Sequence, residues 1–528
     1  MRGIRAKLCG NAASWRFHFR KGFMGDIFRL DIFTFSYVGF FVAMVCFATA
    51  VHILLNKHEE PVSAVLWLVL VFSFPGLGVA LYIVFGVNRV RTRGLRIQTS
   101  TDRMLSGLES GGESRQVESS VRAALANRVK ERHEFEFKGG EGGYPEHDRF
   151  LDRALPDTIP LSGNKIDLLL DGTEAYPSML DAIERAESSV HLQSYIITND
   201  EIGRKLLGAL RLKADSGVEV RILYDKFGSF PAMASRLFAA FMRGTTNLRA
   251  RAFAQAVPWG IQLRNHRKLL VVDGREGFVG GINISSENDG RSAGKDKYIH
   301  DLHCRVEGPV VGELQFVFLR DWHHVSKSSA KDLLSAKYFP FLKAAGDSVA
   351  RVVASGPGQS YEASEQIHMA AATTARRSVW ITAPYFVPDK PFLKALAAAA
   401  TRGLDVRVIV PRRNNHWYVQ LATRSLYPFL IGSGVRVFER SGPFSHAKAT
   451  LVDGEWARMG SSNCDVRSFR LNYELDLVVE RGDFIKRLHD QFEMEFAASS
   501  EIAWGDLAGK SAGAKLAENF CALFTPIL

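Results

Sequence analysis

Residues 266–273 read HRKLLVVD, and residues 446–453 read HAKATLVD. Each stretch holds His-x-Lys and, after four further residues, Asp. His266, Lys268 and Asp273 correspond to His446, Lys448 and Asp453. Beyond each Asp follows a turn of small residues that ends in Asn, GGIN with Asn283 and GSSN with Asn463. One such match could be chance, but two with the same spacing and the same following turn indicate an internal duplication.

Strand and helix patterns alternate around each His-Lys-Asp stretch. In the first half we expect strands at Lys165–Leu170, Val190–Ile197 and Val218–Tyr224, and helices at Ala175–Glu187 and Glu201–Ser216. In the second half we expect strands at Arg351–Ala354, Val379–Phe386 and Val406–Val410, and helices at Glu362–Ala375 and Lys390–Arg402. Each stretch adds one strand, Leu269–Asp273 or Ala449–Asp453, with its His at the start. The sequence predicts two similar α/β halves, 160–345 and 346–500, each a mixed sheet flanked by helices, forming one pseudo-twofold site.

A carboxylate opens the strand that follows each small-residue turn. Asp301 begins the predicted strand Asp301–Glu307, and Glu474 begins Glu474–Glu480. Each comes about thirty residues after the His of its own half. The repeat therefore predicts Asp301 as the partner of His266 and Glu474 as the partner of His446.

Two long apolar stretches lie near the N-terminus. Residues 32–55 carry no charge apart from His52, and residues 62–87 carry none. Each is long enough for a helix that crosses a bilayer. Buried core helices are disfavoured because both stretches are apolar on all sides, and a cleaved signal peptide is disfavoured by the length of the run. We predict a transmembrane hairpin whose second span bends at Pro75, Gly76 and Gly78.

The chain has a net charge of +11, which favours a polyanionic partner, either nucleic acid or an anionic membrane. Basic residues crowd the segment 1–31 and recur at Arg89, Arg91, Arg93 and Arg96, just after the second apolar stretch. The connector 56–61 carries little positive charge. This distribution favours the membrane and predicts that both ends of the hairpin, and the catalytic part, lie in the cytoplasm.

The remaining segments carry weaker signals. Residues 88–159 are rich in Gly, Glu, Arg and Ser and are expected to be a linker with one helix near Glu118–Phe135. In the tail 501–528, Leu507–Leu528 is compatible with an amphipathic helix on the membrane or with a helix packed on the catalytic domain. The five cysteines lack C-x-x-C spacing, which argues against a disulfide framework and a zinc site.

The duplicated residues suit phosphate chemistry. Lysine ammonium groups and Asn amides can bind phosphate oxygens, here through Lys268, Lys448, Asn283 and Asn463. One histidine can attack phosphorus while the other exchanges a proton with the alcohol. A metal site is disfavoured because Lys is a poor ligand, and two buried structural histidines are disfavoured because Lys and Asp are duplicated with them.

Carboxylates have two separate roles in this scheme. Asp301 and Glu474 are candidates to fix the histidine tautomers, as the aspartate does in a serine triad. Asp273 and Asp453 belong to the catalytic stretches, but they stand at the far ends of short strands and are expected to hold the local structure.

The paired H-x-K-x4-D and G-[GS]-x-N motifs resemble the phospholipase D superfamily. Closer phrases resemble bacterial cardiolipin synthases of the two-span type. They are AVLWLVLVFSFPGLGVALYIVFG (64–86), VHLQSYIITND (190–200), RNHRKLLVVDG (264–274), FVGGINISSE (278–287), APYFVPD (383–389), FSHAK (444–448), MGSSNCDVRSFRLNYE (459–474) and the ending Pro526-Ile527-Leu528. The likeness covers roughly residues 60–90 and 160–528. The chain departs from the family pattern at Tyr298-Ile299-His300 and at Asn288.

The resemblance implies a phosphatidyltransferase that needs no metal or other cofactor. Such enzymes move a phosphatidyl group from one phosphatidylglycerol to another through a phosphohistidine, forming cardiolipin and glycerol. On matching positions His266 is the nucleophile and His446 the general acid and base. A phospholipase D or a transferase with another acceptor remains an alternative. A nuclease of the same superfamily is disfavoured by the apolar hairpin, and a non-catalytic lipid-binding protein by two complete motifs.

Overall fold

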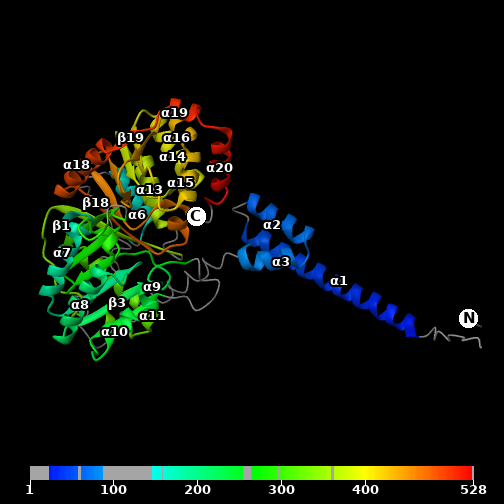
Figure 1. The fold of residues 1–528 in the computed structure, drawn as a ribbon, viewed down its shortest axis with the longest axis horizontal. Helices are drawn as coiled ribbons and strands as arrows, with labels where there is room; N and C mark the ends of the chain where they lie inside the picture. Colours follow the sequence, from blue (N-terminus) through cyan, green and yellow to red (C-terminus); the bar gives the residue numbers. More distant parts are fainter. Residues whose placement is uncertain are drawn as a thin grey trace, which may run out of the picture. The chain divides into compact units, whose positions relative to one another are not determined.

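The duplicated sequence builds one sheet in which both halves repeat the same strand order. The computed structural model describes residues 23–57, 61–86, 145–156, 158–253, 263–294, 297–357 and 362–525. Within them, a 15-stranded sheet has β1 and β9 as antiparallel neighbours at its centre. Outward from β1 lie β8, β6, β5, β2, β3 and β4, and outward from β9 lie β18, β16, β15, β10, β12, β13 and β19. This matching order confirms the predicted duplication, and Figure 1 shows the halves in cyan to green and in yellow to red.

The strands of the first half are β1 (Leu161–Leu170), β2 (Ser189–Ser194), β3 (Glu219–Asp225), β4 (Leu248–Phe253), β5 (Leu269–Val272), β6 (Glu276–Gly280) and β8 (Leu302–Glu307). Those of the second are β9 (Ser348–Ser355), β10 (Ser378–Thr382), β12 (Asp405–Pro411), β13 (Arg436–Arg440), β15 (Ala449–Val452), β16 (Trp456–Gly460), β18 (Glu474–Glu480) and β19 (Ser499–Glu501). In each half, antiparallel strands form the inner part of the sheet and three parallel strands lie outside them, and in the second half β19 adds an antiparallel edge strand. Both halves are therefore mixed sheets, as predicted.

Helices cover both faces of the sheet. Alternate side chains of β5 point to opposite faces, so that Leu269 and Val271 join a core shared by both halves while Leu270 and Val272 join the outer core of the first half. The helices of the first half are α7 (Asp171–Arg185), α8 (Glu201–Asp215), α9 (Phe230–Ala234), α10 (Leu237–Met242), α11 (Val311–Ser326) and α12 (Ala330–Leu333). Those of the second are α13 (Ala363–Thr374), α14 (Lys390–Thr401), α15 (Trp417–Ser425), α16 (Tyr427–Gly432), α17 (Val466–Arg470) and α18 (Asp483–Ala497). Residues of α11 and α18 fill the shared core, which holds the two halves together.

Short strand pairs bring segments of the two halves together beside the sheet. β7 (Ile299–His300) of the first half pairs in parallel with β14 (Phe444–Ser445) of the second. The counterpart of this contact is a single parallel bridge between Asn265 and Tyr473. Within the second half, β11 (Phe386–Val387) pairs with β17 (Cys464–Asp465). The two crossing pairs stand directly before the residues of the candidate site.

The N-terminal apolar region, residues 1–89, forms a unit of its own. Its first helix, α1 (Phe23–Asn56), contains the segment Gly39–Asn56, which alone among the described residues is long and apolar enough to cross a membrane. The second predicted span is divided into α2 (Pro61–Ser73), α3 (Leu77–Leu81) and a π-helical turn, η1 (Tyr82–Gly86). The break confirms the predicted bend, because Gly76 has a φ of +85° that favours glycine.

The two apolar segments of this unit pack against each other. The Nδ1 atom of His52 lies 2.9 Å from the hydroxyl oxygen of Tyr82, so the polar group in each segment finds its partner in the other. Trp67 contacts the same tyrosine edge to face, with ring centroids 5.4 Å apart. The pair therefore has the shape of a hairpin.

Two segments outside the halves also have structure. The predicted linker contains α6 (Pro145–Ala154), where His147 stacks on Trp456 with ring centroids 3.7 Å apart. The linker helix expected near Glu118–Phe135 lies outside the described residues. The tail forms α19 (Trp504–Ala508) and α20 (Ala512–Ala522) rather than one helix over Leu507–Leu528. Since α20 packs on α15, the structure agrees with the expectation of a tail helix packed on the catalytic domain.

Candidate active site

Each histidine of the duplicated motif is attached to the opposite half of the chain. The backbone N–H of His266 donates to the carbonyl oxygen of Tyr473 at 2.9 Å. The backbone N–H of His446 donates to the carbonyl oxygen of His300 at 2.7 Å. Because Tyr473 directly precedes Glu474 and His300 directly precedes Asp301, each contact brings a carboxylate to the histidine of the other half.

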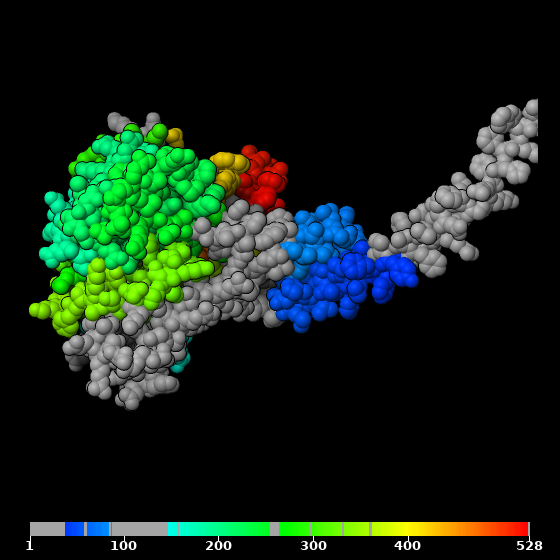
Figure 2. Space-filling view, turned by 90° about the horizontal axis from the view of Figure 1, so that it is seen from below, coloured from blue at the N-terminus to red at the C-terminus, as the bar shows by residue number. Residues whose placement is uncertain are grey.

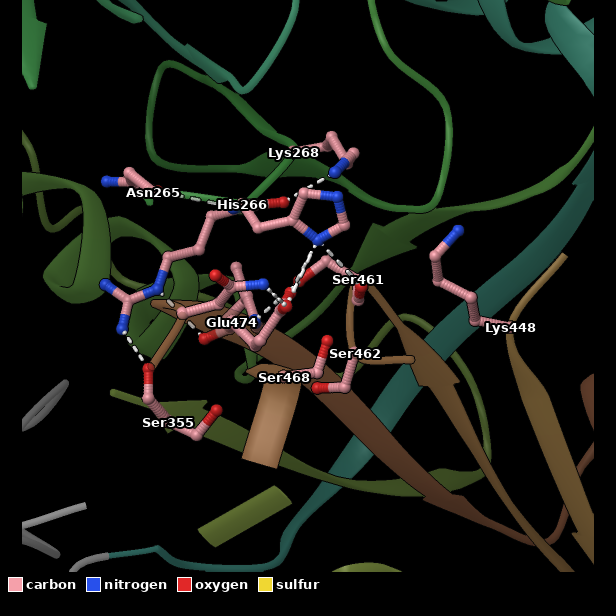
Figure 3. Close-up of polar contacts among 12 residues, drawn as sticks. Asn265, His266, Lys268, Ser355, Lys448, Ser461, Ser462, Ser468 and Glu474 are labelled. Atoms are coloured by element: carbon pink, nitrogen blue, oxygen red, sulfur yellow. Dashed lines mark hydrogen bonds and ion pairs between the residues drawn. The ribbon is translucent and has the colours of Figure 1, made fainter. Parts of the chain in front are cut away.

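The carboxylate partners are consequently exchanged between the halves. Glu474 Oε2 lies 2.9 Å from His266 Nδ1, and Asp301 Oδ2 lies 2.7 Å from His446 Nδ1. The prediction that Asp301 serves His266 and Glu474 serves His446 is therefore wrong. The repeat fixes which residues are equivalent, whereas the pairing depends on the crossing contacts between halves, which have no sequence signal. Figure 3 shows the His266 ring directed at Glu474.

The contacts of His266 define its tautomer. Its Nδ1 atom lies 3.1 Å from the carbonyl oxygen of Ser461 as well as close to the Glu474 carboxylate. Both neighbours accept hydrogen bonds, so Nδ1 carries the hydrogen and Nε2 keeps its lone pair. Glu474 is held in turn by Ser461 Oγ at 2.5 Å and by Asn472 Nδ2 at 3.1 Å. His266 thus keeps an Nε2 atom whose lone pair is available.

The contacts of His446 are of a different kind. Its Nδ1 atom lies 2.7 Å from Asp301 Oδ2 and 2.9 Å from the ammonium nitrogen of Lys448. Since one neighbour accepts and the other donates, this ring is not restricted to one tautomer as His266 is. It is suited to gain and lose a proton.

Two buried lysines flank the histidines. Lys268 Nζ donates to the carbonyl oxygen of His266 at 2.6 Å, and Lys448 Nζ donates to that of His446 at 2.5 Å. Burial and the charge of Lys448 lower the pKa of Lys268 to about 7, and burial lowers the pKa of Lys448 to about 8. Figure 3 shows both lysine side chains beside the His266 ring. Buried ammonium groups so close together favour an anionic partner.

The ionisable groups differ between the two sites. Burial and the charges of Lys268 and Lys448 hold the pKa of His266 well below its usual value, and burial with Lys448 lowers the pKa of His446 to about 3. Burial raises the pKa of Glu474, against the opposing charge of Lys268. The pKa of Asp301 is lowered, because Lys448 and His446 together outweigh the effect of its burial. Asp301 is therefore the more firmly ionised carboxylate.

The remaining predicted residues lie at different distances from this chemistry. Asn283 Oδ1 accepts from the backbone N–H of Ile196 at 3.2 Å, and Asn463 Oδ1 is buried without a hydrogen-bond partner among the described residues. Asp273 accepts the backbone N–H groups of Glu187, Ser188 and Ser189. Asp453 does the same for Arg376, Arg377 and Ser378. These contacts confirm that both aspartates hold local structure, at the turns before β2 and β10.

Several residues around the histidines were not predicted. The ring of Tyr195 contacts His266 edge to face at a centroid distance of 4.9 Å, and Tyr385 does the same to His446 at 6.0 Å. Both follow equivalent strands, but Tyr195 comes directly after β2 whereas Ala383 and Pro384 separate Tyr385 from β10, so the repeat gives only an approximate signal for them. The buried Arg267 binds Asp321 at 2.5 Å and the carbonyl oxygen of Glu474 at 2.9 Å. Its counterpart is Ala447, and the repeat therefore gives no signal for it.

The described residues contain no cluster of three or more His, Cys, Asp or Glu that could hold a metal ion. The four described cysteines are buried and unpaired.

A fold with two crossed His-carboxylate pairs and two buried lysines defines the class of phosphatidyltransferases related to phospholipase D. The family described as "Cardiolipin synthase, PLD-like domain" matches residues 179–322 and 369–496. The family described as "Phospholipase_D-nuclease N-terminal" matches residues 45–86. The chain belongs to the cardiolipin synthase family.

Full-length relatives agree with this assignment. The cardiolipin synthase of Geobacillus thermodenitrificans is 32% identical over 89% of this chain and 90% of its own length. That of Listeria innocua is 31% identical over 91% of this chain and 97% of its own length. A solved structure, the phosphatidylserine synthase of Haemophilus influenzae, shares the fold with a TM-score of 0.55 at 15% identity, covering 72% of this chain and all of that one. The N-terminal family match and the apolar helix α1 indicate association with a membrane.

Proposed function

We propose that this chain transfers a phosphatidyl group from one phosphatidylglycerol to the terminal hydroxyl of another, giving cardiolipin and glycerol. The observation that carries the proposal is the pair of unlike histidines, one with a fixed tautomer and one beside an ionised aspartate, next to two buried lysines. Exchange of one phosphodiester for another is nearly neutral in free energy. No nucleotide or metal is needed to drive it.

In the first step, His266 Nε2 attacks phosphorus and the bond from phosphorus to the glycerol oxygen breaks. His446, in its protonated form, donates a proton to that oxygen, and glycerol leaves. The product is a phosphatidyl group bound to His266, whose Nδ1–H remains hydrogen-bonded to Glu474. Lys268, Lys448, Asn283 and Asn463 bind the phosphate oxygens and stabilise the charge of the transition state.

In the second step, neutral His446 removes the proton from the hydroxyl of the second phosphatidylglycerol. The oxygen attacks phosphorus, the bond from phosphorus to nitrogen breaks, and His266 is released. The proton taken up by His446 replaces the one that it gave in the first step. Without substrate, burial and the charge of Lys448 lower the pKa of His446 to about 3, so the protonated form of His446 depends on the bound phosphate anion, which offsets the lysine charge. The low pKa of Asp301 supports this role, because an ionised carboxylate favours the imidazolium form of His446.

The same proposal extends to the membrane. Two crossings by 32–55 and 62–87, with both ends in the cytoplasm, would anchor the catalytic unit at the inner face of the bacterial inner membrane. Anionic phospholipid is then the partner of the chain, and nucleic acid is not. A lipid surface supplies an alcohol as the acceptor. If water took its place, the intermediate would be hydrolysed and the enzyme would act as a phospholipase.

A direct assay tests the reaction. Purified full-length protein in detergent is given phosphatidylglycerol labelled in its glycerol headgroup, without CTP or added metal. We expect labelled glycerol to be released together with cardiolipin in equal amounts. Phosphatidic acid as the only lipid product would mean hydrolysis, and the absence of turnover would sink the proposed reaction.

Two histidine variants test the assignment of roles. His266→Ala and His446→Ala are each expected to abolish cardiolipin synthesis, while His489→Ala, at a half-buried histidine of α18, serves as the control. After acid-free quenching, His446→Ala should retain a phosphatidyl-protein adduct and His266→Ala should not. An adduct found in His266→Ala alone would reverse the two roles.

A further inference from the structure

The outer face of helix α20 carries a stripe of exposed apolar side chains. Leu516, Phe520 and Leu523 have exposed fractions of 72%, 59% and 74%. Their spacing of four and then three residues places them on one side of the helix. Isolated exposed apolar residues are ordinary, but a continuous stripe of large ones is typical of a surface that binds an apolar partner.

The inner face of α20 fixes the direction of this stripe. Cys521 packs into a small core with Val419 and Ala422 of α15. Glu518 is buried and accepts from Lys510 Nζ at 2.7 Å. Because polar and apolar contacts hold the helix from one side, the stripe is presented outward rather than folded into the core. Figures 1 and 2 show α20 in red at the surface beside the yellow α15.

The core beneath α20 leads to the active site. Tyr385 packs against the cluster that contains Cys521, and its ring lies edge to face with His446. The same tyrosine contacts His416, with ring centroids 5.7 Å apart. The next residue, Trp417, begins α15 and is 67% exposed. Aromatic side chains thus connect the catalytic histidine to the surface that carries the stripe.

Positive charge lies next to the exposed tryptophan. Arg412 and Arg413 are both exposed in the loop that follows β12, and neither forms an ion pair with the rest of the described chain. The equivalent loop after β3 carries exposed Phe227 and Phe230 beside Lys226. In both halves, therefore, the loop next to the catalytic histidine combines aromatic and basic side chains. This combination is typical of residues at the interface between a bilayer and water.

We propose that Trp417, Leu516, Phe520 and Leu523, with Arg412 and Arg413, form a membrane-docking rim that inserts into the interface of an anionic bilayer. The occupant is lipid because the exposed Arg412 and Arg413 stand shortly before Trp417, the first residue of the helix on which α20 packs, and their positive charge matches anionic headgroups. The proposal rests on the proposed function for its purpose, which is to let phosphatidylglycerol reach His446 from the bilayer along the aromatic side chains. It concerns a contact of the catalytic unit that is separate from the N-terminal anchor.

Site-specific quenching tests the contact. Full-length Phe520→Cys and Leu523→Cys are labelled with an environment-sensitive fluorophore and placed in nanodiscs whose lipids carry brominated acyl chains and 30% phosphatidylglycerol. Leu212→Cys is the matched control, since Leu212 is also 72% exposed and belongs to α8, a helix that Figure 1 shows on the opposite side of the catalytic unit from α20. We expect the labels in the rim to be quenched about threefold more strongly than the control label.

Three results would overturn the proposal. One is equal quenching of rim and control labels, which would place the rim in water. Another is quenching that does not fall when Arg412→Gln and Arg413→Gln are combined, or when phosphatidylglycerol is replaced by phosphatidylcholine. The third is self-quenching between labels that rises with protein concentration, which would mean that a second copy covers the stripe. The fluorescence of any label attached to native cysteines is measured on the chain without an introduced cysteine.

An activity measurement separates this proposal from the proposed reaction. Phe520→Asn combined with Leu523→Asn is expected to raise the KM for phosphatidylglycerol in nanodiscs about tenfold. Turnover of short-chain phosphatidylglycerol dissolved as monomers should not change, which also shows that the variant is folded. An equal loss on both substrates would overturn the docking role. If the unaltered chain failed to make cardiolipin, only the proposed reaction would be disproved. The docking proposal would stand, because fluorescence quenching measures docking independently of the reaction.

Discussion

The two histidine sites have the same framework but different supports. Ser461 donates a hydrogen bond to Glu474 beside His266, whereas its counterpart beside the other pair is Gly281. A Cβ atom at Gly281 would lie 2.1 Å from Asp301 Oδ1, so the shorter carboxylate occupies the space that a serine would need. Glu474 is thus a long carboxylate with neutral donors around it, and Asp301 a short one beside an ammonium group. The two copies share the His, Lys and Asp residues of the motif and differ in the residues that surround them.

The charge states follow from this difference. Deep burial raises the pKa of Glu474 despite the charge of Lys268 and the neutral donors around it, while Lys448 and His446 lower the pKa of Asp301 against its burial. The first pair is suited to hold a neutral imidazole in one tautomer, and the second to stabilise an imidazolium. If the sites do unlike jobs, changes at equivalent positions should have unlike consequences.

The largest effect should come from neutralising the carboxylates. Glu474→Gln and Asp301→Asn are each expected to reduce cardiolipin synthesis about a thousandfold, because an amide no longer fixes the tautomer or stabilises positive charge. Rapid-quench measurements should show slow formation of the adduct in Glu474→Gln. In Asp301→Asn they should show slow transfer from the adduct to the acceptor lipid. The same rate-limiting step in both variants would contradict the division of roles.

The next effect concerns the small residue behind each carboxylate. Gly281→Ala is expected to lower synthesis about a hundredfold, since the new methyl group must displace Asp301 from His446. Ser461→Ala removes only one hydrogen bond to Glu474 and should cost about tenfold. The turnover of each variant at saturating lipid, divided by that of the unaltered chain, gives the two losses to be compared. Equal losses would mean that the two positions are equivalent after all.

The sequence predicted most of the fold because the duplication repeats local patterns that depend on short-range physics. The strand β5 alternates between two cores, and Pro75 and Gly76 interrupt the apolar run, as the residue types require. It also identified both histidines, both lysines and both carboxylates. These residues could be identified because each copy carries them in short stretches of its own sequence.

Pairing across the two halves was not predictable in the same way. Glu474 reaches His266 because Tyr473 bridges to Asn265, a contact between segments 208 positions apart that leaves no periodic pattern. Arg267 escaped notice because its partners, Asp321 and two backbone carbonyl groups, become neighbours only in the folded chain. Long-range polar contacts of this kind have to be read from the structure.

A third difference lies in the residue before each carboxylate. His300 precedes Asp301 and is held between Asp171 at 2.9 Å and Glu495 at 2.8 Å, whereas Tyr473 precedes Glu474. Hydrogen bonds and charge from both carboxylates outweigh burial and raise the pKa of His300 to about 9. A folded pKa above the unfolded value of about 6.5 means that the stabilisation is complete below pH 6.5 and is lost as the pH rises through 9.

His300→Gln should therefore destabilise the catalytic unit by about 2 kcal/mol at pH 6, an effect that fades towards pH 10. Urea unfolding of the full chain in detergent, followed by tryptophan fluorescence, measures the difference from the unaltered protein at each pH. In that difference, the contributions of other groups that titrate in this range, such as Lys448 and Glu480, to the unfolding free energy cancel. His300→Arg keeps the positive charge and should show little dependence on pH. A constant difference between pH 6 and 10 would contradict the ion-pair explanation.

The smallest effect on activity is expected where the two halves are most alike. Asp273 and Asp453 make equivalent hydrogen bonds to three backbone N–H groups, and both adopt a positive φ, 52° and 56°, that Asn tolerates. Asp273→Asn and Asp453→Asn should therefore keep synthesis within about twofold of the unaltered chain while lowering stability by about 1 kcal/mol. Parallel measurements of turnover and urea unfolding check both values. If either variant lost activity while keeping full stability, that aspartate would take part in the chemistry. If the two variants lost activity unequally, the difference between the two histidine sites would extend to the hydrogen bonds of Asp273 and Asp453.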